Sequence, residues 1–349
     1  MLTKLEIKNY KSICDASITL SPFTLLIGAN GTGKSNFVSV LKYIASPTVM
    51  IAVNDDGEEG QVSAEDEEDV YSNFVSFENM RSLYREYIQV FQKHTSHLEE
   101  SQKLVIHNDS SSVEIENGEV RDIKAFSNIS ELRDIEVFQI NPDCAGREEE
   151  VIANPLIKED GSGVVQVLDS LKSGDREDLF QKVEEELKRY IPELEKLSFI
   201  PGKSSKRLQV REQYISSPLP LSELSEGTKL TLTILAILYQ ENPPSLVCIE
   251  DIDRGIHPRL FQQVIELCFD LSKQRGIQIV ATTHNPYILD QFVGNESAVV
   301  IVEKKEGCTT FTTLAERLAQ LQTNGSESEE EMPLGSLWYS GLVGGVPKR

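Results

Sequence analysis

The chain of 349 residues is 39% hydrophobic, which is enough apolar surface for one large domain with a sizeable core. Its formal net charge of −22 opposes nonspecific binding to nucleic acid or to an anionic membrane, because both attract clusters of Lys and Arg. The sequence shows neither a signal peptide nor an apolar run of about 18 residues, so we expect a cytoplasmic protein without a membrane partner. The five cysteines are scattered and form no CxxC pair, which predicts reduced thiols.

Strands and one helix are predicted near the N-terminus. Residues 2–10 and 15–20 alternate between apolar and polar side chains, whereas 23–28 form a continuous apolar run that is typical of a buried strand. Residues 33–46 carry apolar side chains at helical spacing. The next stretch, 54–70, is acidic and poor in apolar residues, which predicts a mobile loop.

The middle of the chain mixes strands and helices, and the last third alternates between them. Small antiparallel strands are predicted over 103–123, with a turn at Asn117 and Gly118. Further predictions are strands at 135–142 and 206–214 and helices at 163–171 and 176–190. From Ser225 onward helices alternate with strands at 245–250 and 277–283. This alternation implies a mostly parallel sheet covered by helices on both faces, so the predicted fold class is α/β.

Residues 28–35, GANGTGKS, match the phosphate-binding pattern G-x-x-x-x-G-K-[ST]. The pattern lies between an apolar strand and an amphipathic helix, which is the context that it requires. Backbone N–H groups of the loop and of the helix N-terminus would surround phosphates. Lys34 would reach the β- and γ-phosphates, and the Ser35 hydroxyl would coordinate Mg²⁺. A glycine-rich turn that matches by chance is the alternative, and the order of strand, motif and helix argues against it.

Two acids, Glu250 and Asp251, follow directly after the apolar run 246–249. A buried strand that ends in two carboxylates needs a cation, and beside a phosphate-binding loop that cation is the Mg²⁺ of the nucleotide. We expect Glu250 to hold the metal, directly or through water, and Asp251 to orient the attacking water. A surface turn with fortuitous acids is the alternative.

Two further segments carry candidate residues. Ser225, Gly227 and Thr228 begin a predicted helix, whose free N–H groups can bind an anion. His284 ends the apolar strand 277–283. Taken alone, Ser225 is explained as an N-cap and His284 as a satisfied histidine at a strand end.

These motifs in this order resemble the ABC-type ATPase heads of the RecF/SMC/OLD group, and in particular the stand-alone AAA-family ATPases of its bacterial defence-associated branch. LSEGT stands where transporter ATPases have LSGGQ, IEDIDRGIHP resembles the EEPE…LHP form of the OLD-like branch, and ATTHNPYIL resembles its switch segment. The resemblance implies a P-loop ABC-type head that has a mostly parallel sheet flanked by helices, an antiparallel β subdomain and a helical lobe. It also implies that Ser225 of one subunit caps the γ-phosphate bound by the other and that His284 senses that phosphate. The implied nucleotide-binding residues are Lys11, Asn30, Gly31, Thr32, Gly33, Lys34, Ser35, Asn36, Ser225, Gly227 and Thr228.

The sequence departs from the family pattern at two places near the acids. The OLD-like branch has Glu-Glu followed by Pro, whereas this chain has Glu250, Asp251 and Ile252. Because Asp251 is one methylene shorter, we expect slow turnover. The segment that should supply a metal-binding amide, VFQINP, offers either Gln139 or Asn141, and an ordinary strand-end amide is the alternative for both.

The whole chain, 1–349, is predicted to be a single ATPase head. Its nucleotide-binding core is expected at 1–50 and 196–314, an insertion and helical lobe at 51–195, and a tail at 315–349. The segment between Ser35 and Ser225 is too short for the coiled-coil arms of SMC proteins. We also expect no fused nuclease domain of the OLD kind.

The first functional hypothesis is an ATPase that uses ATP and Mg²⁺ and forms a head-to-head homodimer or a higher oligomer on ATP. It would act as a switch for a separate effector, such as a nuclease or toxin in bacterial anti-phage defence; this step is analogy. The alternative is a RecF-like DNA repair factor, for which the basic candidates are Lys203, Lys206, Arg207 and Arg211. A transporter ATPase is a weaker third hypothesis. Acidic residues 327–331 with Trp338 and Tyr339 are expected to bind the effector or to fold back onto the sheet.

Overall fold

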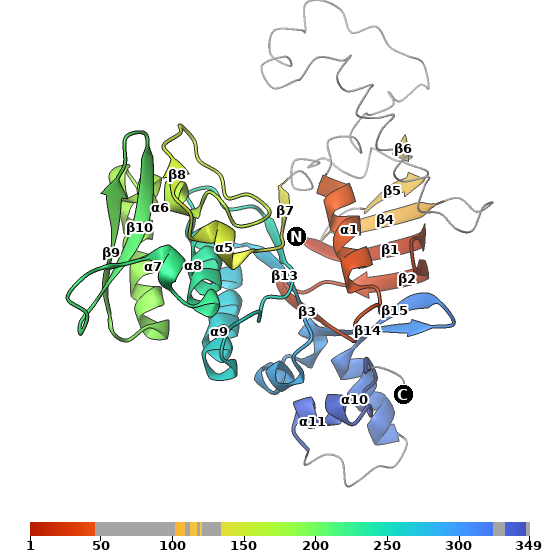
Figure 1. Ribbon diagram of the computed structural model, residues 1–349. Coiled ribbons are helices and arrows are strands. Elements are labelled where there is room, and N and C mark those ends of the chain that lie inside the picture. Colours follow the sequence, from red (N-terminus) through yellow and green to blue (C-terminus); the bar gives the residue numbers. More distant parts are fainter. Residues whose placement is uncertain (46–101, 109–111, 117–118, 121–133, 324–331, 347–349) are drawn as a thin grey trace, which may run out of the picture.

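The computed structural model describes residues 1–45, 102–108, 112–116, 119–120, 134–323 and 332–346 (Figure 1). The predicted acidic segments 54–70 and 327–331 lie outside these residues. The α/β fold class is confirmed, since a parallel-rich sheet flanked by helices is accompanied by an antiparallel sheet. None of the helices in the described part of the chain has the length and hydropathy of a membrane span.

A mostly parallel sheet forms the centre of the described structure. Its strand order is β15-β14-β3-β13-β12-β7, and the edge pair β14–β15 is antiparallel. The strands are β3 (Phe23–Ile27), β7 (Ile135–Phe138), β12 (Leu246–Ile249), β13 (Gln278–Thr283), β14 (Val299–Lys305) and β15 (Cys308–Thr313).

The central strands present alternate side chains to two separate cores, because successive side chains of a strand point to opposite faces. Leu25 and Val247 lie in one core with helices α8 (Glu226–Tyr239) and α9 (Pro258–Arg275). Leu26 and Cys248 lie in the other core with helix α1 (Lys34–Ala45). Burial on both faces explains why β12 is an unbroken apolar run. It also means that α1 and α8 cover opposite faces of the sheet.

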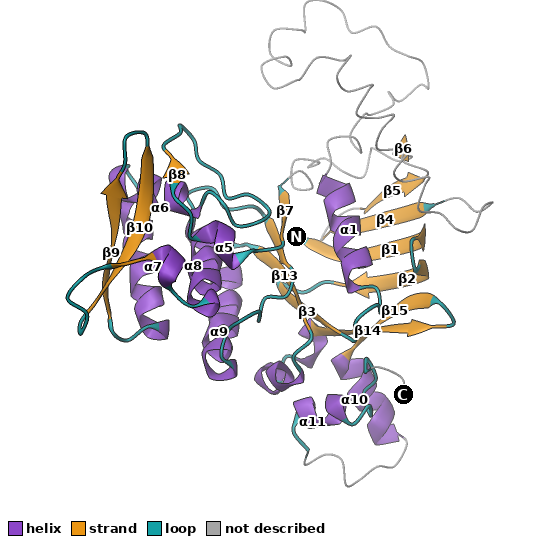
Figure 2. Ribbon diagram, in the orientation of Figure 1, coloured by secondary structure: helices purple, strands orange, loops and turns teal. Residues whose placement is uncertain are grey.

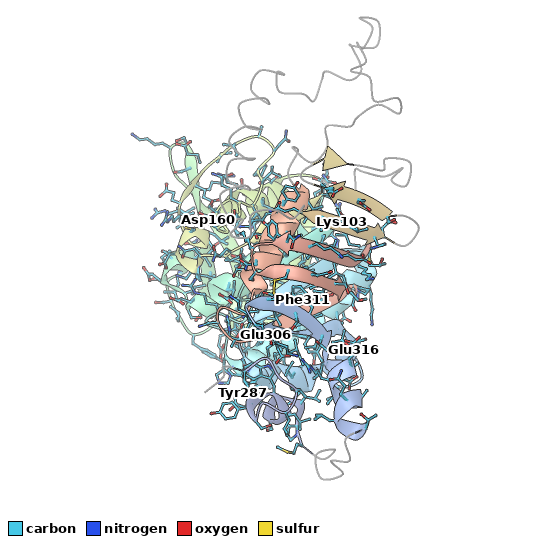
Figure 3. The ribbon with its side chains drawn as sticks, turned by 90° about the vertical axis from the view of Figure 1, so that its right-hand side faces the viewer. Lys103, Asp160, Tyr287, Glu306, Phe311 and Glu316 are labelled. Atoms are coloured by element: carbon cyan, nitrogen blue, oxygen red, sulfur yellow. A yellow bond between two sulfur atoms is a disulfide. The ribbon has the colours of Figure 1, made fainter. Side chains whose placement is uncertain are left out.

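An antiparallel sheet of order β2-β1-β4-β5-β6 completes the core around α1. The β14–β15 hairpin of the central sheet lies along strand β2 of this antiparallel sheet (Figure 3). Phe311 on β15 packs against Phe37 of α1, with ring centroids 5.6 Å apart. The predicted antiparallel strands over 103–123 are therefore present. The strands are β1 (Leu2–Tyr10), β2 (Ile13–Thr19), β4 (Lys103–Asn108), β5 (Ser112–Glu116) and β6 (Glu119–Val120).

A second lobe combines a small antiparallel sheet with helices, which Figure 2 shows between that sheet and the central one. The hairpin β9–β10 pairs with two short strands, not with the central sheet, so the expected core boundary at residue 196 falls inside β9. The elements are α5 (Pro142–Ala145), β8 (Glu149–Glu150), α6 (Val164–Ser173), α7 (Glu177–Tyr190), β9 (Leu194–Pro201), β10 (Ser205–Glu212), β11 (Leu219–Pro220) and the 3-10 helix η3 (Leu221–Glu223).

The prediction of five reduced thiols is wrong for two of them. Cys14 on β2 and Cys308 on β15 form a disulfide, with their Cα atoms 5.5 Å apart. The two residues are 294 positions apart in the sequence, so no spacing pattern could indicate the pair. The other three cysteines are free and buried, and burial raises the pKa of each thiol; they are Cys144, Cys248 and Cys268.

The C-terminal segment folds onto the central sheet. Of the two alternatives for this segment, the structure supports folding back onto the sheet: Trp338 on helix α11 is 7% exposed and belongs to the main core, whereas Tyr339 is 78% exposed. The Gly345 carbonyl accepts a hydrogen bond from the Ala29 amide at 2.7 Å. The remaining elements are η4 (Pro286–Phe292), η5 (Glu296–Ala298), α10 (Leu314–Thr323) and α11 (Leu334–Tyr339).

Trp338→Ala should lower the free energy of unfolding by about 3–5 kcal/mol, because it removes a large side chain from a packed core. The exposed neighbour provides a matched control: Tyr339→Ala should change that free energy by no more than about 0.5 kcal/mol. Urea unfolding followed by circular dichroism measures both. Equal destabilisation by the two variants would contradict the packing described for α11.

Candidate functional site

The glycine-rich loop between β3 and α1 folds around the side chain of Lys34. The Lys34 amine donates to the Gly28 carbonyl at 2.7 Å and to the Ala29 carbonyl at 3.0 Å. The Thr32 hydroxyl donates to the same Ala29 oxygen at 2.9 Å. Lys34 is buried, whereas Asn30, Gly31 and Ser35 are exposed. The outer residues of the loop are therefore exposed to solvent, and the ammonium group of Lys34 lies at its buried base.

Gly33 is required where the loop meets β15. Its φ is +114°, and a Cβ atom there would lie 2.1 Å from the Thr309 hydroxyl oxygen. That hydroxyl donates to the Thr32 carbonyl at 2.8 Å. Any side chain at residue 33 would therefore clash with the Thr309 side chain that supports the loop.

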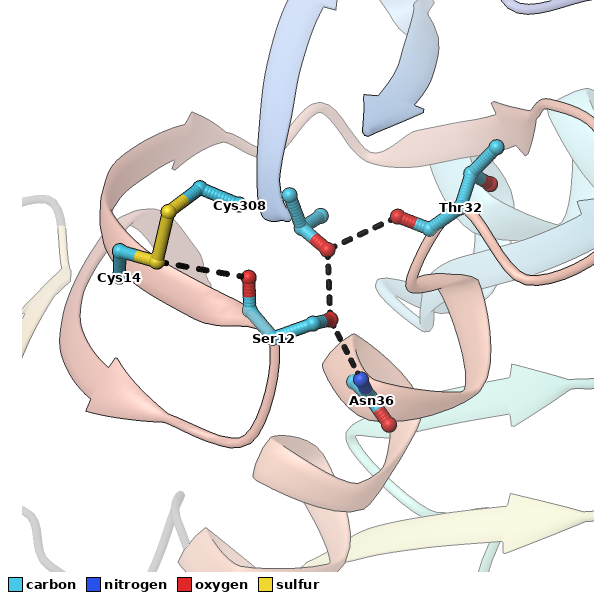
Figure 4. Close-up of a disulfide and its surroundings, with 6 residues drawn as sticks. Ser12, Cys14, Thr32, Asn36 and Cys308 are labelled. Atoms are coloured by element: carbon cyan, nitrogen blue, oxygen red, sulfur yellow. Dashed lines mark hydrogen bonds between the residues drawn. A yellow bond between two sulfur atoms is a disulfide. The ribbon is translucent and has the colours of Figure 1, made fainter. Parts of the chain in front are cut away.

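The side chain of Asn36 faces this same support. Its amide donates to the Ser12 hydroxyl at 2.6 Å, and Ser12 Oγ lies 2.7 Å from Thr309 Oγ1 (Figure 4). Asn36 was expected to bind nucleotide, but here its amide joins the loop helix α1 to the turn before β2. The sequence pattern gave no sign of Ser12 or Thr309.

The parallel pairing of the strands brings Ser35 and Glu250 together. β13 pairs with both β3 and β12, so the carboxyl ends of the three strands meet at one edge. The Ser35 hydroxyl donates to the Glu250 carboxylate at 3.3 Å. Burial raises the pKa of Glu250, because it disfavours the charged form. A cation at this point would stabilise the carboxylate that burial disfavours.

The chemistry of these two oxygen donors fits Mg²⁺. Within the described residues, no group of three or more His, Cys, Asp and Glu side chains could hold a metal by itself. Mg²⁺ is commonly bound through one or two protein oxygens together with substrate phosphates. Ser35 and Glu250 would therefore hold the ion only alongside a nucleotide.

His284 lies between Lys34 and Asp251. Its Nδ1 is 3.3 Å from the Lys34 amine, and its Nε2 is 3.8 Å from an Asp251 carboxylate oxygen. Asp251 has φ of +49°, a left-handed conformation that Asp adopts more readily than most residues. This backbone conformation suits Asp at the position where the resemblance to the OLD-like branch led us to expect Glu.

Two threonines that sequence reasoning missed hold the ends of β12 and β13 together. The Asp251 amide donates to the Thr282 hydroxyl at 3.0 Å. The Thr283 hydroxyl donates to the Asp253 carboxylate at 2.8 Å, and burial raises the pKa of that carboxyl. The signal was present in the sequence as ATTH, two hydroxyl residues at the end of an apolar strand. Both contacts restrict the positions of Asp251 and His284.

The expected phosphate-capping segment begins α8. Ser225 is its N-cap, and its hydroxyl accepts the Thr228 amide at 3.2 Å. A Cβ atom on Gly227 would lie 2.4 Å from the Gly255 carbonyl oxygen, so glycine allows this helix start to approach the turn after the two acids. The structure places the segment on the face opposite α1 and does not join it to the loop of the same chain by any hydrogen bond among the described residues.

The remaining predicted site residues are Lys11 and the two candidate metal-binding amides, Gln139 and Asn141. The Lys11 amine donates to Ser39 on α1 at 2.8 Å, just beyond the loop. Gln139 follows β7 and is exposed. The Asn141 side chain accepts the Asp143 amide at 3.1 Å as the N-cap of α5. That oxygen of Asn141 therefore already caps a helix, whereas the Gln139 side chain is exposed.

Comparison with solved structures shows likeness to Smc heads. One bound to the C-winged helix domain of ScpA has a TM-score of 0.50 at 17% identity, covering 92% of this chain and 99% of that chain. A head with an extended coiled coil, bound to the C-terminal domain of ScpA derived from Pyrococcus furiosus, scores 0.49 at 14% identity, with coverage of 93% and 98%. The SMC head domain from Thermotoga maritima scores 0.44 at 15% identity, with coverage of 89% and 98%. At such identities the likeness concerns the fold alone.

Comparison with curated proteins gave no match. The family described as "AAA domain, putative AbiEii toxin, Type IV TA system" matches residues 23–290. The match spans more than half of the chain and contains the glycine-rich loop, both strand-end acids and His284. The chain therefore belongs to this family of AAA domains.

Proposed function

We propose that the protein binds ATP with Mg²⁺ at the carboxyl edge of the central sheet and hydrolyses it. The observation that carries the proposal is the 3.3 Å contact between Ser35 and Glu250, which joins the loop helix to the acidic end of β12. Family membership supports the same activity. The proposed site also includes Lys34, Asp251 and His284, which lie around one point at this edge.

Each side chain has a distinct part in this reaction. Lys34 places its cation beside the β- and γ-phosphates, and the amides of the glycine-rich loop donate to them. Ser35 and Glu250 would hold Mg²⁺, which would neutralise charge that develops on the phosphates. Asp251 orients the attacking water, and His284 contacts the γ-phosphate.

A second copy of the chain would complete the site. The first turn of α8 after Ser225 would offer backbone N–H groups to an anion, yet α8 lies on the face of the sheet opposite α1. A head-to-head homodimer would bring Ser225, Gly227 and Thr228 of one copy to the γ-phosphate bound by the other. The dimer would therefore contain two composite sites.

The proposed effector protein and its biological role rest on analogy with the family. We propose a cytoplasmic switch for a separate effector, such as a nuclease or toxin of a bacterial defence system. The rival hypothesis of a DNA repair factor has weaker support, because two of its four basic candidates are paired with acids. Lys206 contacts Asp169 at 2.6 Å, and Arg207 contacts Glu148 at 3.3 Å.

Mixing two inactive variants tests the composite site. Lys34→Ala should abolish hydrolysis at the copy's own loop, and Ser225→Arg should block capping of the partner's phosphate. Each variant alone should be inactive, but a mixture should regain measurable phosphate release, since a mixed dimer contains one intact loop facing one intact Ser225.

A second mixture provides the matched control. Lys34→Ala and Asp251→Asn both damage the same half of a site, so their mixed dimers contain no intact site and should stay inactive. A first mixture as inactive as the control would contradict the composite dimer. Full activity of Lys34→Ala alone would contradict the ATP site itself.

Nucleotide binding should also take up a proton. Burial lowers the pKa of Lys34 to about 8, with Asp251 acting in the opposite direction. Bound phosphates would favour the charged form of the Lys34 amine. Above about pH 8 the amine of the free protein is mostly neutral, so it must take up a proton when the nucleotide binds. Affinity should therefore fall as pH rises above about 8, by up to about tenfold per pH unit.

Calorimetry at about pH 8.5 in two buffers of different ionisation heat measures this uptake. Lys34→Arg is the control, because its guanidinium stays charged throughout this range. We expect proton uptake by the wild type and less by the variant. Equal uptake by both proteins would show that Lys34 is not the group that titrates.

A further inference from the structure

We propose that the disulfide between Cys14 and Cys308 is a reversible redox site whose reduction weakens nucleotide binding. The inference rests on the proposed nucleotide site and adds a chemical control to it. Three features support it: the partial exposure of the two bonded cysteines, the hydrogen bonds that their chain neighbours Ser12 and Thr309 make to the P-loop and its helix, and the contrast with the buried cysteines.

The two bonded cysteines are accessible, whereas the free ones are not. Cys14 and Cys308 are half-buried near the surface. Cys144, Cys248 and Cys268 are buried, and burial raises the pKa of each thiol. Since the thiolate is the reactive form, these three residues are poor partners in thiol–disulfide exchange. A redox reagent would therefore act first on the Cys14–Cys308 pair.

Residues that neighbour the disulfide in the chain make hydrogen bonds to the P-loop and to helix α1, which follows it (Figure 4). Thr309 follows Cys308, and its hydroxyl donates to the Thr32 carbonyl at 2.8 Å. Ser12 precedes Cys14 by two residues, and its hydroxyl accepts the Asn36 amide at 2.6 Å. The disulfide thus joins the two segments whose side chains contact the loop and the helix that follows it.

Two hydrogen bonds accompany the covalent link. The Thr309 amide donates to the Ser12 carbonyl at 2.6 Å, and the two hydroxyl oxygens lie 2.7 Å apart. β2 and β15 belong to different sheets, so no ladder of strand hydrogen bonds fixes one against the other. The ladder from β15 through β14 to β3 holds Thr309 on the central sheet, so without the disulfide only the placement of β2 and Ser12 against Thr309 depends on these contacts and on side-chain packing.

The chemical step is a two-electron thiol–disulfide exchange. A thiolate of a dithiol reductant attacks one cysteine sulfur and forms a mixed disulfide with it, while the Cys14–Cys308 bond breaks and the other cysteine leaves as a thiolate. The second thiolate of the reductant then attacks the mixed disulfide and releases the first cysteine. Cys14 and Cys308 each gain one proton and one electron, and the reductant becomes a disulfide. A disulfide oxidant reverses the step. After reduction the β14–β15 hairpin can move relative to β2, so the loop loses part of its preorganisation.

The test compares oxidised and reduced full-length protein. The dissociation constant of a non-hydrolysable ATP analogue with Mg²⁺ should rise about two- to tenfold on treatment with a dithiol, as expected for loss of about one hydrogen bond at the loop. Reoxidation should restore it. Thiol alkylation and mass spectrometry report the state of each cysteine in the same samples.

Two kinds of variant separate the disulfide from other effects of the reductant. Cys14→Ser and Cys308→Ser should bind the analogue as the reduced wild type does, with or without reductant. Cys268→Ala retains the disulfide and should respond as the wild type does. Circular dichroism confirms that each variant is folded before binding is measured.

Equal affinity of the oxidised and reduced wild type would overturn the redox inference while leaving the nucleotide site intact. The same response to reductant in Cys14→Ser as in the wild type would also overturn it. Failure of every form to bind the analogue would overturn the proposed nucleotide site, and the redox inference with it.

Discussion

The parallel pairing of β3, β13 and β12 is the constraint on which the candidate site depends. Strands that run in one direction end at one edge, so residues that are remote in sequence meet there. Ser35 and Glu250 are 215 positions apart, and Lys34 and His284 are 250 apart, yet both pairs are in contact. No single local motif could produce this arrangement. The chemistry proposed for the site is a consequence of the sheet's topology.

The loop at this edge is also held by the last part of the chain. The Gly345 carbonyl accepts the Ala29 amide, and the Thr309 hydroxyl donates to the Thr32 carbonyl. A loop that must present several amides to phosphates gains from such support, because preorganised donors need not rearrange when the substrate binds. The C-terminal segment is therefore part of the structure that supports the proposed nucleotide site. The disulfide beside Thr309 ties this support covalently to the N-terminal sheet.

Periodicity and motif context predicted the parts of the structure that depend on local sequence. The unbroken apolar run of β12 indicated a strand buried on both faces, and the helix after the glycine-rich loop follows from its apolar spacing. The order of the motifs also indicated which strand ends belong together. The alternation of strands and helices predicted the α/β fold class, and the structure confirms it.

Features that depend on contacts between distant segments could not be predicted. The Cys14–Cys308 bond requires β15 to lie beside β2, which no residue pattern reveals. Trp338 stands beside the exposed Tyr339 in a short helix, and only the packing of that helix decides which ring is buried. The left-handed backbone at Asp251 likewise depends on Thr282 from the neighbouring strand.

The most direct test of the account is to measure ATP affinity and phosphate release for Asp251→Asn. Asn tolerates the left-handed backbone as Asp does, and the change removes only the charge that is proposed to orient water. The account predicts that ATP affinity is retained while phosphate release falls by about 10²–10⁴-fold. Phosphate release equal to that of the wild type would contradict the role given to this edge of the sheet.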